Sequence, residues 1–434
     1  MRKSRNKQLG YWEITSIGIG GMVGGGIFAV LGLSVKLAQG GAPIAFLIAG
    51  IVALVTSYSY AKLSIAFPSQ GGTVRFLDRA FGSGLLTGSA NILLWISYII
   101  MLSLYAYAFG SYGASFFPPG IQLFWKHVLI TGIVLGITVL NLLNTTIIGE
   151  AEDWIVLLKL LILCIFIGTG IWGVVAAKLA PAAWSSPMQL VAGGMIIFVA
   201  YEGFELIANT AQDVRDPTKT LPRAYYSSVA FVILLYILVA VVTVGTLSVD
   251  NILNARDYAL AEAAKPSLGN TGFVLIAIAA MLSTASAINA TIYGAARLSY
   301  AIAKDGELPD FLERKAWGKP ITGLLITTGA TLLIANLVNL SSMSTMGSAG
   351  FLLIFAAVNG ANVILAPETG SRIWLSLIGA GLCLGALGCL IWQVQSHTPG
   401  QLWFLIAMLG TAIFVEGTFR VTMGRKIYFS KVKE

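Results

Sequence analysis

The chain has 434 residues, of which 57% are hydrophobic and 11% are charged, and its formal net charge is +8. Soluble domains carry about 25% charged residues, so this composition excludes an ordinary soluble protein and predicts a polytopic membrane protein. The three cysteines all lie in apolar runs, which indicates no disulfide framework. The two histidines have no Cys, Asp or Glu cluster at metal-ligand spacing, so we expect no metal site and no cofactor.

Twelve apolar runs are each long enough for the roughly 20 residues of a membrane-spanning helix. They predict an all-α protein with twelve transmembrane helices at residues 11–36, 42–67, 84–110, 125–145, 154–177, 188–211, 224–247, 270–303, 321–341, 347–366, 373–394 and 402–423.

The first of these runs follows the basic N-terminus "MRKSRNK". It is longer than a signal-peptide core and offers no convincing cleavage site, so we expect it to be retained. Most of the 27 Lys and Arg residues fall in loops on the side of the two termini. This distribution predicts a multi-pass protein of the cell membrane with both termini in the cytoplasm, and it explains the positive charge without nucleic acid.

The first span contains "GIGGMVGGGIFAVLG", residues 18–32, with seven glycines. Gly20 with Gly24, and Gly21 with Gly25, have the small-xxx-small spacing of close helix packing. Seven glycines exceed what packing requires, and the run Gly24 to Gly26 predicts an unwound segment followed by a second half-helix. Free amides at that helix start, together with its positive dipole end, suit a carboxylate.

The fifth span contains a single lysine, Lys159, within "DWIVLLKLLILCIFIG". Such a side chain either extends back to the membrane interface or stays buried, where it exchanges a proton and serves as a coupling group. The local pattern favours the first alternative, because the surrounding span is apolar on every side and reveals no polar face.

The sixth span contains "FVAYEGFELIAN", in which Glu202 and Glu205 flank Gly203 near the middle of the membrane. A charged carboxylate facing lipid there would cost roughly 2.5–3.5 kcal/mol, so both must face protein or water. Each of them either bonds the interrupted backbone or binds a ligand directly, and the carbonyls from Val199 to Glu202 suit an ammonium group. Interrupted spans at corresponding places in two halves point to an inverted-repeat transporter.

Three segments resemble the amino acid/polyamine/organocation superfamily. "GIGGMVGGGIF" resembles its first-helix motif, "FVAYEGFELIANTAQDVRDPTKTLPRA" its sixth helix and following loop, and "INATIYGAARLSYAIAKDGELPDFLERK" its eighth helix and following loop. The likeness covers about residues 10–320. Within the superfamily, the chain is most similar to archaeal proton-coupled amino acid transporters that carry a lysine in the fifth helix.

The resemblance implies a LeuT-like fold with a five-plus-five inverted repeat. Residues 1–182 would form the first repeat (helices 1–5) and residues 183–368 the second (helices 6–10). Residues 369–434 would form the peripheral helices 11 and 12 and a cytoplasmic tail.

The resemblance also implies the site. The proton-coupling group would be Lys159, in contact with the carbonyl near Gly20 and with hydroxyls among Ser283, Thr284 and Ser286. A substrate carboxylate would meet the amides of Gly24, Gly25 and Gly26, and its amine the carbonyls of Met22, Val199 and Glu202. Phe198 and Tyr201 are candidates for the side-chain pocket or gate, and Glu205 for a gating or titrating group. Relatives have serine at position 25, whereas Gly25 leaves only backbone donors.

We therefore expect a secondary transporter that imports amino acids by proton symport with alternating access, with the amino acid, protons and the lipid bilayer as its partners. A sodium-coupled symporter or an exchanger of the same fold is the alternative. A channel would need a pore lined by rings of charge or carbonyls. An enzyme is not expected, because no span brings together a nucleophile and a base.

Overall fold

The computed structural model describes residues 9–143, 146–304 and 321–422. The basic residues at the two ends of the chain, which support the predicted orientation, lie outside these ranges, as does most of the loop after the eighth predicted span.

The described part of the chain is helical and contains no strand, only isolated β-bridges at Leu9–Val214 and Gln39–Trp184. The α-helices and the longest 3-10 helix are α1 (Tyr11–Met22), α2 (Gly26–Ala38), α3 (Ala42–Ala66), α4 (Thr73–Phe81), α5 (Leu85–Ala114), α6 (Gln122–Leu143), α7 (Thr146–Gly170), α8 (Pro187–Ile196), η5 (Phe198–Asp213), α9 (Pro217–Thr246), α10 (Val249–Ala255), α11 (Ala259–Lys304), α12 (Ile321–Leu337), α13 (Leu340–Ile364), α14 (Ala366–Thr369), α15 (Ile373–His397) and α16 (Gly400–Thr422).

The prediction of an all-α polytopic fold is confirmed, although the count of twelve spans is not. Among the described residues, nine helices are long and apolar enough to cross a membrane, and two bent pairs raise the number to eleven. The bent pairs are α1 with α2, at 47°, and α8 with η5, at 45°. The predicted span 321–341 corresponds to α12, an apolar helix of 17 residues that follows directly on a part of the chain outside the described ranges.

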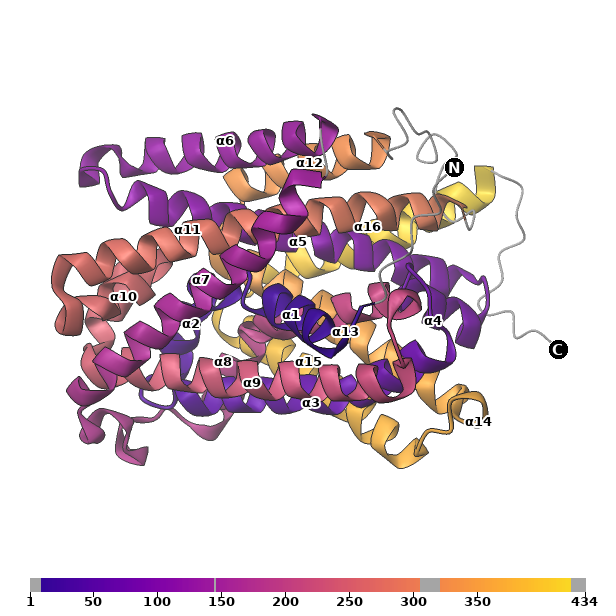
Figure 1. The fold of residues 1–434 in the computed structure, drawn as a ribbon, viewed down its shortest axis with the longest axis horizontal. Coiled ribbons are helices and arrows are strands. Elements are labelled where there is room, and N and C mark those ends of the chain that lie inside the picture. The colour runs from indigo at the N-terminus through magenta and orange to yellow at the C-terminus, as the bar shows by residue number, and fades with distance from the viewer. Residues whose placement is uncertain (1–8, 144–145, 305–320, 423–434) are drawn as a thin grey trace.

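Most of the long helices lie side by side along one direction, whereas α7 crosses them obliquely, and the short helices α1 and α2 lie in the middle of the view (Figure 1). α5 packs along α11, α3 packs along α9, and α1 contacts both η5 and α9. In the same view, α4 and α14 lie at one end of the bundle and α10 at the other. Both interrupted spans therefore lie inside a shell of continuous helices.

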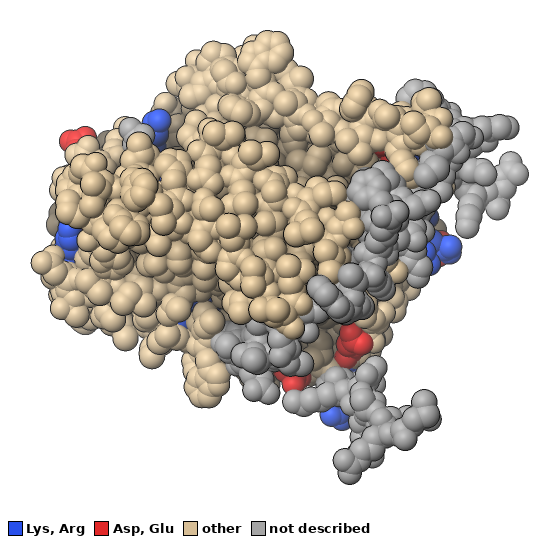
Figure 2. Space-filling view, turned by 90° about the horizontal axis from the view of Figure 1, so that it is seen from above, with Lys and Arg blue, Asp and Glu red and all other residues tan. Residues whose placement is uncertain are grey.

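A broad face of the molecule carries apolar side chains. Figure 2 shows this face almost free of Lys, Arg, Asp and Glu, which appear toward the two ends. Exposed tryptophans lie at or near helix ends, among them Trp12, Trp172 and Trp403. Tryptophan is enriched at membrane interfaces, so an apolar belt bounded by such residues is the surface expected of a protein surrounded by lipid.

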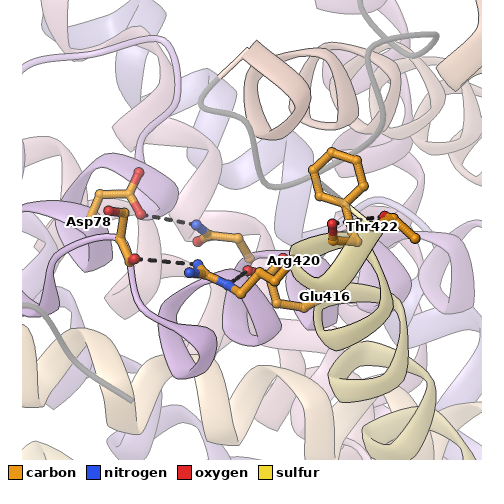
Figure 3. A network of polar contacts seen from close by, with 7 residues as sticks. Asp78, Glu416, Arg420 and Thr422 are labelled. Atoms are coloured by element: carbon orange, nitrogen blue, oxygen red, sulfur yellow. Dashed lines mark hydrogen bonds and ion pairs between the residues drawn. The ribbon is translucent and has the colours of Figure 1, made fainter. Parts of the chain in front are cut away.

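The last described helix, α16, contains a buried ion pair. Arg420 donates to the carboxylate of Glu416 four residues earlier, and both side chains are buried. Figure 3 shows this pair close to Asp78 of α4. Arg420 also donates to the carbonyl of Ser83 at 3.4 Å, so α16 is bonded to the segment between α4 and α5.

Candidate functional site

The first interrupted span consists of α1 and α2, which are separated by Val23, Gly24 and Gly25. The break falls within the glycine-rich stretch where the sequence predicts it. The amides of Gly26, Ile27 and Phe28 form the first turn of α2, where backbone donors have no partner within the helix. The positive end of the α2 dipole is therefore located near the middle of the bundle.

The carbonyls at this break are bonded by side chains from three neighbouring helices. Lys159 of α7 donates to the Gly20 carbonyl at 3.1 Å, and Tyr236 of α9 donates to the Met22 carbonyl at 2.6 Å. Ser283 of α11 donates to the Val23 carbonyl at 2.8 Å and also to the Gly24 carbonyl. The unwound backbone is thus held in protein, the setting in which irregular backbone is tolerated at membrane depth.

The glycines of the two interrupted spans also allow a close crossing. A Cβ atom on Gly203 would lie 2.2 Å from the backbone carbon of Gly21 and 2.3 Å from the amide nitrogen of Met22. A Cβ atom on Gly26 would lie 2.7 Å from Ala200. Both explanations of the glycines therefore hold, because they supply an unwound segment and also remove side chains where α1, α2 and η5 cross.

The second break lies earlier than predicted. α8 ends at Ile196 and η5 begins at Phe198, so the bend falls at Ile197, one residue before the predicted interruption at residues 198–205, which belong to the 3-10 helix η5. Ser344 and Ser348 of α13 donate to the Ile196 carbonyl at 2.5 and 3.1 Å, and the Val199 amide donates to Ser348 at 3.0 Å. Hydroxyls of α13 thus bond the backbone on both sides of the bend.

Tyr236 contacts both interrupted spans at once. In addition to the Met22 carbonyl, its hydroxyl lies 3.3 Å from the carbonyl of Ala200. The sequence analysis did not identify Tyr236, because an apolar run with one tyrosine carries no signal that its hydroxyl meets two distant segments.

Two candidates for the pocket or gate are packed in the interior. Tyr201 is fully buried and donates to the Phe46 carbonyl at 2.9 Å. Phe198 is fully buried as well, and its ring centroid lies 5.8 Å from that of Phe355. Neither residue lines the cavity described next.

A cavity of about 320 Å³ lies beside the first break, between α1, α5, α7, η5 and α11. Its lining residues are Ser16, Ile17, Gly20, Gly21, Tyr105, Val156, Glu202, Leu206, Ser286, Ala287, Ala290 and Thr291. It brings together three of the predicted site residues, Gly20, Glu202 and Ser286. From the break it extends along α1 toward the helix start.

The other predicted residues lie around this cavity rather than in its lining. The side chain of Lys159 is 1% exposed and is bonded to Gly20. Thr284 donates to the carbonyls of Ala280 and Met281 in its own helix, at 2.7 and 3.1 Å. Of the three predicted hydroxyls, that of Ser283 is bonded to the break, and Ser286 lines the cavity.

Gly25 lies against an aromatic ring. A Cβ atom at this position would lie 2.3 Å from Cδ1 of Tyr105, a residue that lines the cavity. A serine could not occupy position 25 unless that ring moved. The ring of Tyr105 therefore occupies the space that a side chain at position 25 would need.

The two glutamates of η5 have different surroundings. The Glu205 carboxylate accepts hydrogen bonds from Tyr98 at 2.5 Å, Tyr60 at 3.0 Å and Thr73 at 3.3 Å. Glu202 accepts from Tyr105 at 3.5 Å through Oε1, whereas its Oε2 has no hydrogen-bond partner in the described part of the chain. Glu205 therefore connects η5 to α3, α4 and α5, and Glu202 lines the cavity.

Long apolar helices, two interrupted spans and a cavity between them define a multi-pass membrane protein with the architecture of a secondary transporter. The chain belongs to the amino acid permease family, whose model matches residues 9–414. This match confirms the superfamily resemblance drawn from the three sequence motifs.

Three relatives align with nearly the whole chain. An uncharacterized protein of Methanocaldococcus jannaschii is 39% identical over 94% of this chain and 95% of the relative. The inner membrane transport protein YbaT of Escherichia coli is 32% identical over 94% of this chain and 96% of its own length. The methylthioribose transporter of Bacillus subtilis is 26% identical over 95% and 93%, respectively.

Proposed function

We propose that this protein imports amino acids by proton symport with alternating access, and that Lys159 is the proton-coupling residue. The observation that carries the proposal is the buried ammonium of Lys159, bonded at 3.1 Å to the Gly20 carbonyl near the end of α1. The amino acid substrate class follows from family membership.

The contact provides a physical link between proton and helix. A charge-assisted hydrogen bond is roughly twice as strong as a neutral one. When Lys159 releases its proton, its bond to the Gly20 carbonyl weakens, and α1 is held less firmly against α7. Protonation therefore changes the stability of one conformation relative to another, which coupled transport requires.

The substrate would lie where the two breaks meet. Its carboxylate would approach the amides of Gly25 and Gly26, because the Gly24 amide already donates to the Gly21 carbonyl at 3.3 Å. Its amine would approach the carbonyls beside the two breaks. Because the ring of Tyr105 lies against Gly25 and lines the cavity, a substrate that reaches these amides would contact or displace that ring.

We further propose the inverted repeat of residues 1–182 and 183–368, with peripheral helices in residues 369–434. The pairing of bent spans, α1 with α2 and α8 with η5, supports this division. We also propose that the protein lies in the cell membrane with both termini in the cytoplasm. The cavity then extends toward the cytoplasmic end of α1, so this conformation would open inward.

The test is uptake of labelled amino acids into proteoliposomes, first with an imposed pH gradient and then with a sodium gradient. We expect uptake to follow the pH gradient and to be lost in Lys159→Met. The matched control is Lys62→Met, since Lys62 lies in α3 and donates to the Gly370 carbonyl at 3.2 Å, away from the breaks. This variant should retain pH-driven uptake.

Two results would overturn parts of the proposal. Uptake driven by sodium alone would replace proton symport by the sodium-coupled alternative. Uptake that follows the pH gradient equally well in Lys159→Met would remove Lys159 from the coupling mechanism while retaining amino acid transport.

A further inference from the structure

The cavity contains a buried carboxylate oxygen without a hydrogen bond. Glu202 is 2% exposed and lines the cavity, and its Oε2 has no partner among the described residues. Its other oxygen accepts one long bond from Tyr105, at 3.5 Å. An unsatisfied buried polar atom in a native structure requires an explanation, and a ligand that completes its bonding is one.

The chemistry of the missing partner follows from the lining. Burying a carboxylate without partners costs several kcal/mol, so the group that completes the site should be a strong hydrogen-bond donor with positive charge. The described lining residues include no Lys, Arg or His, and several of them are small, among them Gly20, Gly21 and Ala287. An ammonium or guanidinium group of a substrate is a donor of this kind, and the cavity of about 320 Å³ has room for it.

Charge balance indicates which part of the substrate this is. A zwitterionic amino acid is neutral, and its carboxylate and ammonium can be matched by the amides at the start of α2 and by the unwound carbonyls. The carboxylate of Glu202 is additional to these groups. A substrate that neutralises it must carry a second positive charge.

Tyr105 lies against both anchor points. Its Cδ1 atom lies 2.3 Å from where a Cβ atom of Gly25 would be, and its hydroxyl lies 3.5 Å from Oε1 of Glu202. The same hydroxyl lies 3.5 Å from where a Cβ atom of Gly24 would be, so the Glu202 carboxylate is close to the start of α2. A lysine or arginine whose carboxylate meets the amides of α2 has a side chain long enough to reach Glu202.

We propose that Glu202 binds the cationic side-chain group of the substrate, so that the preferred substrates are amino acids with a positively charged side chain. This inference rests on the proposed transport function and specifies its substrate class.

The test compares substrates of nearly equal shape that differ in side-chain charge. Lysine is paired with norleucine, and arginine with citrulline, in equilibrium binding to the purified protein and in proteoliposome uptake. In the unmodified protein we expect lysine and arginine to bind at least tenfold more tightly than their neutral counterparts. In Glu202→Gln, we expect this preference to fall below about twofold while norleucine is still bound.

Glu205→Gln is the matched control, because Glu205 stands on the same helix and its carboxylate is already bonded by Tyr98, Tyr60 and Thr73. We expect this variant to keep the preference for lysine even if its overall uptake falls. Glu202→Met is a second variant, and thermal unfolding of each purified protein shows whether it is folded.

Several results would overturn the inference without touching the proposed function. One is equal binding of lysine and norleucine to the unmodified protein, with normal uptake of neutral amino acids. Another is a preference for lysine that persists in Glu202→Gln. A third is a Glu202→Gln variant that keeps the ratio of lysine to norleucine affinity but loses pH-driven uptake, which would make Glu202 a proton site. If no amino acid is bound or carried by the unmodified protein, the proposed function itself fails.

Discussion

Glu202 and Glu205 occupy the same 3-10 helix three residues apart, and both are almost completely buried. In such a helix, side chains at this spacing lie on one face, about 6 Å apart along the axis. α5 offers each of them a tyrosine, Tyr105 to Glu202 and Tyr98 to Glu205. Only Glu205 receives two further hydroxyls. The comparison shows that burial alone does not give a carboxylate a structural role. That role depends on how many hydrogen-bond donors surround the carboxylate.

The largest expected effect comes from Gly203, which stands between the two glutamates. In Gly203→Val, the new Cβ atom would meet backbone atoms of Gly21 and Met22, which no rotamer change can move away. We expect loss of folded protein, measured by size-exclusion chromatography and thermal unfolding. Gly132→Val in α6 is the control, because a Cβ atom there meets nothing within 4 Å. Normal folding of Gly203→Val would show that η5 does not cross α1 so closely.

A second prediction extends the comparison to a third buried carboxylate, Glu416. Removing one partner of a buried ion pair typically costs about 3–5 kcal/mol, because the remaining charge stays buried. We expect Arg420→Met to lower the free energy of unfolding by this amount and to weaken the attachment of α16 beside α4 (Figure 3). The double variant with Glu416→Gln should recover part of the loss. Equal unfolding temperatures of the single variant and the parent protein would contradict the prediction.

The third prediction tests the two glutamates directly. In Glu205→Ala, the hydroxyls of Tyr98, Tyr60 and Thr73 lose their shared acceptor, and we expect a destabilisation of roughly 2–4 kcal/mol. Glu202→Ala should lower the free energy of unfolding by no more than about 1 kcal/mol without substrate, because its carboxylate has a single long bond to lose. Unfolding in detergent without amino acids measures both, and equal losses would remove the distinction drawn between them.

The smallest expected effect concerns the bend at Ile197. Ser348→Ala removes the hydroxyl that bonds the Ile196 carbonyl and the Val199 amide. Hydrogen bonds between membrane helices contribute about 0.6 kcal/mol on average, and Ser344 still bonds the same carbonyl, so we expect a loss of about 1 kcal/mol or less. A loss as large as that of Glu205→Ala would mean that the bend, rather than the glutamate, fixes the position of η5.

Each of the two interrupted helices could be predicted from the residue pattern within its own span. The glycine run located the first break, because an unwound segment needs residues without side chains at a close helix crossing. The second break lies at Ile197, outside the predicted segment. Its position could not be predicted, because the serines that bond it belong to α13, which is distant in the sequence. The positions of Tyr236, Tyr98 and Tyr60 could not be predicted, because their partners are set by which helices become neighbours. Likewise, only the packed structure separates the roles of Glu202 and Glu205.

The unbonded oxygen of Glu202 also has an evolutionary consequence. A side chain with few bonded neighbours can be replaced without destabilising the fold. Selection on position 202 would therefore act mainly through substrate binding. Position 205, bonded to three other elements, lacks that freedom. Among descendants of this chain, substitutions that change the substrate should therefore accumulate at position 202, while position 205 stays unchanged.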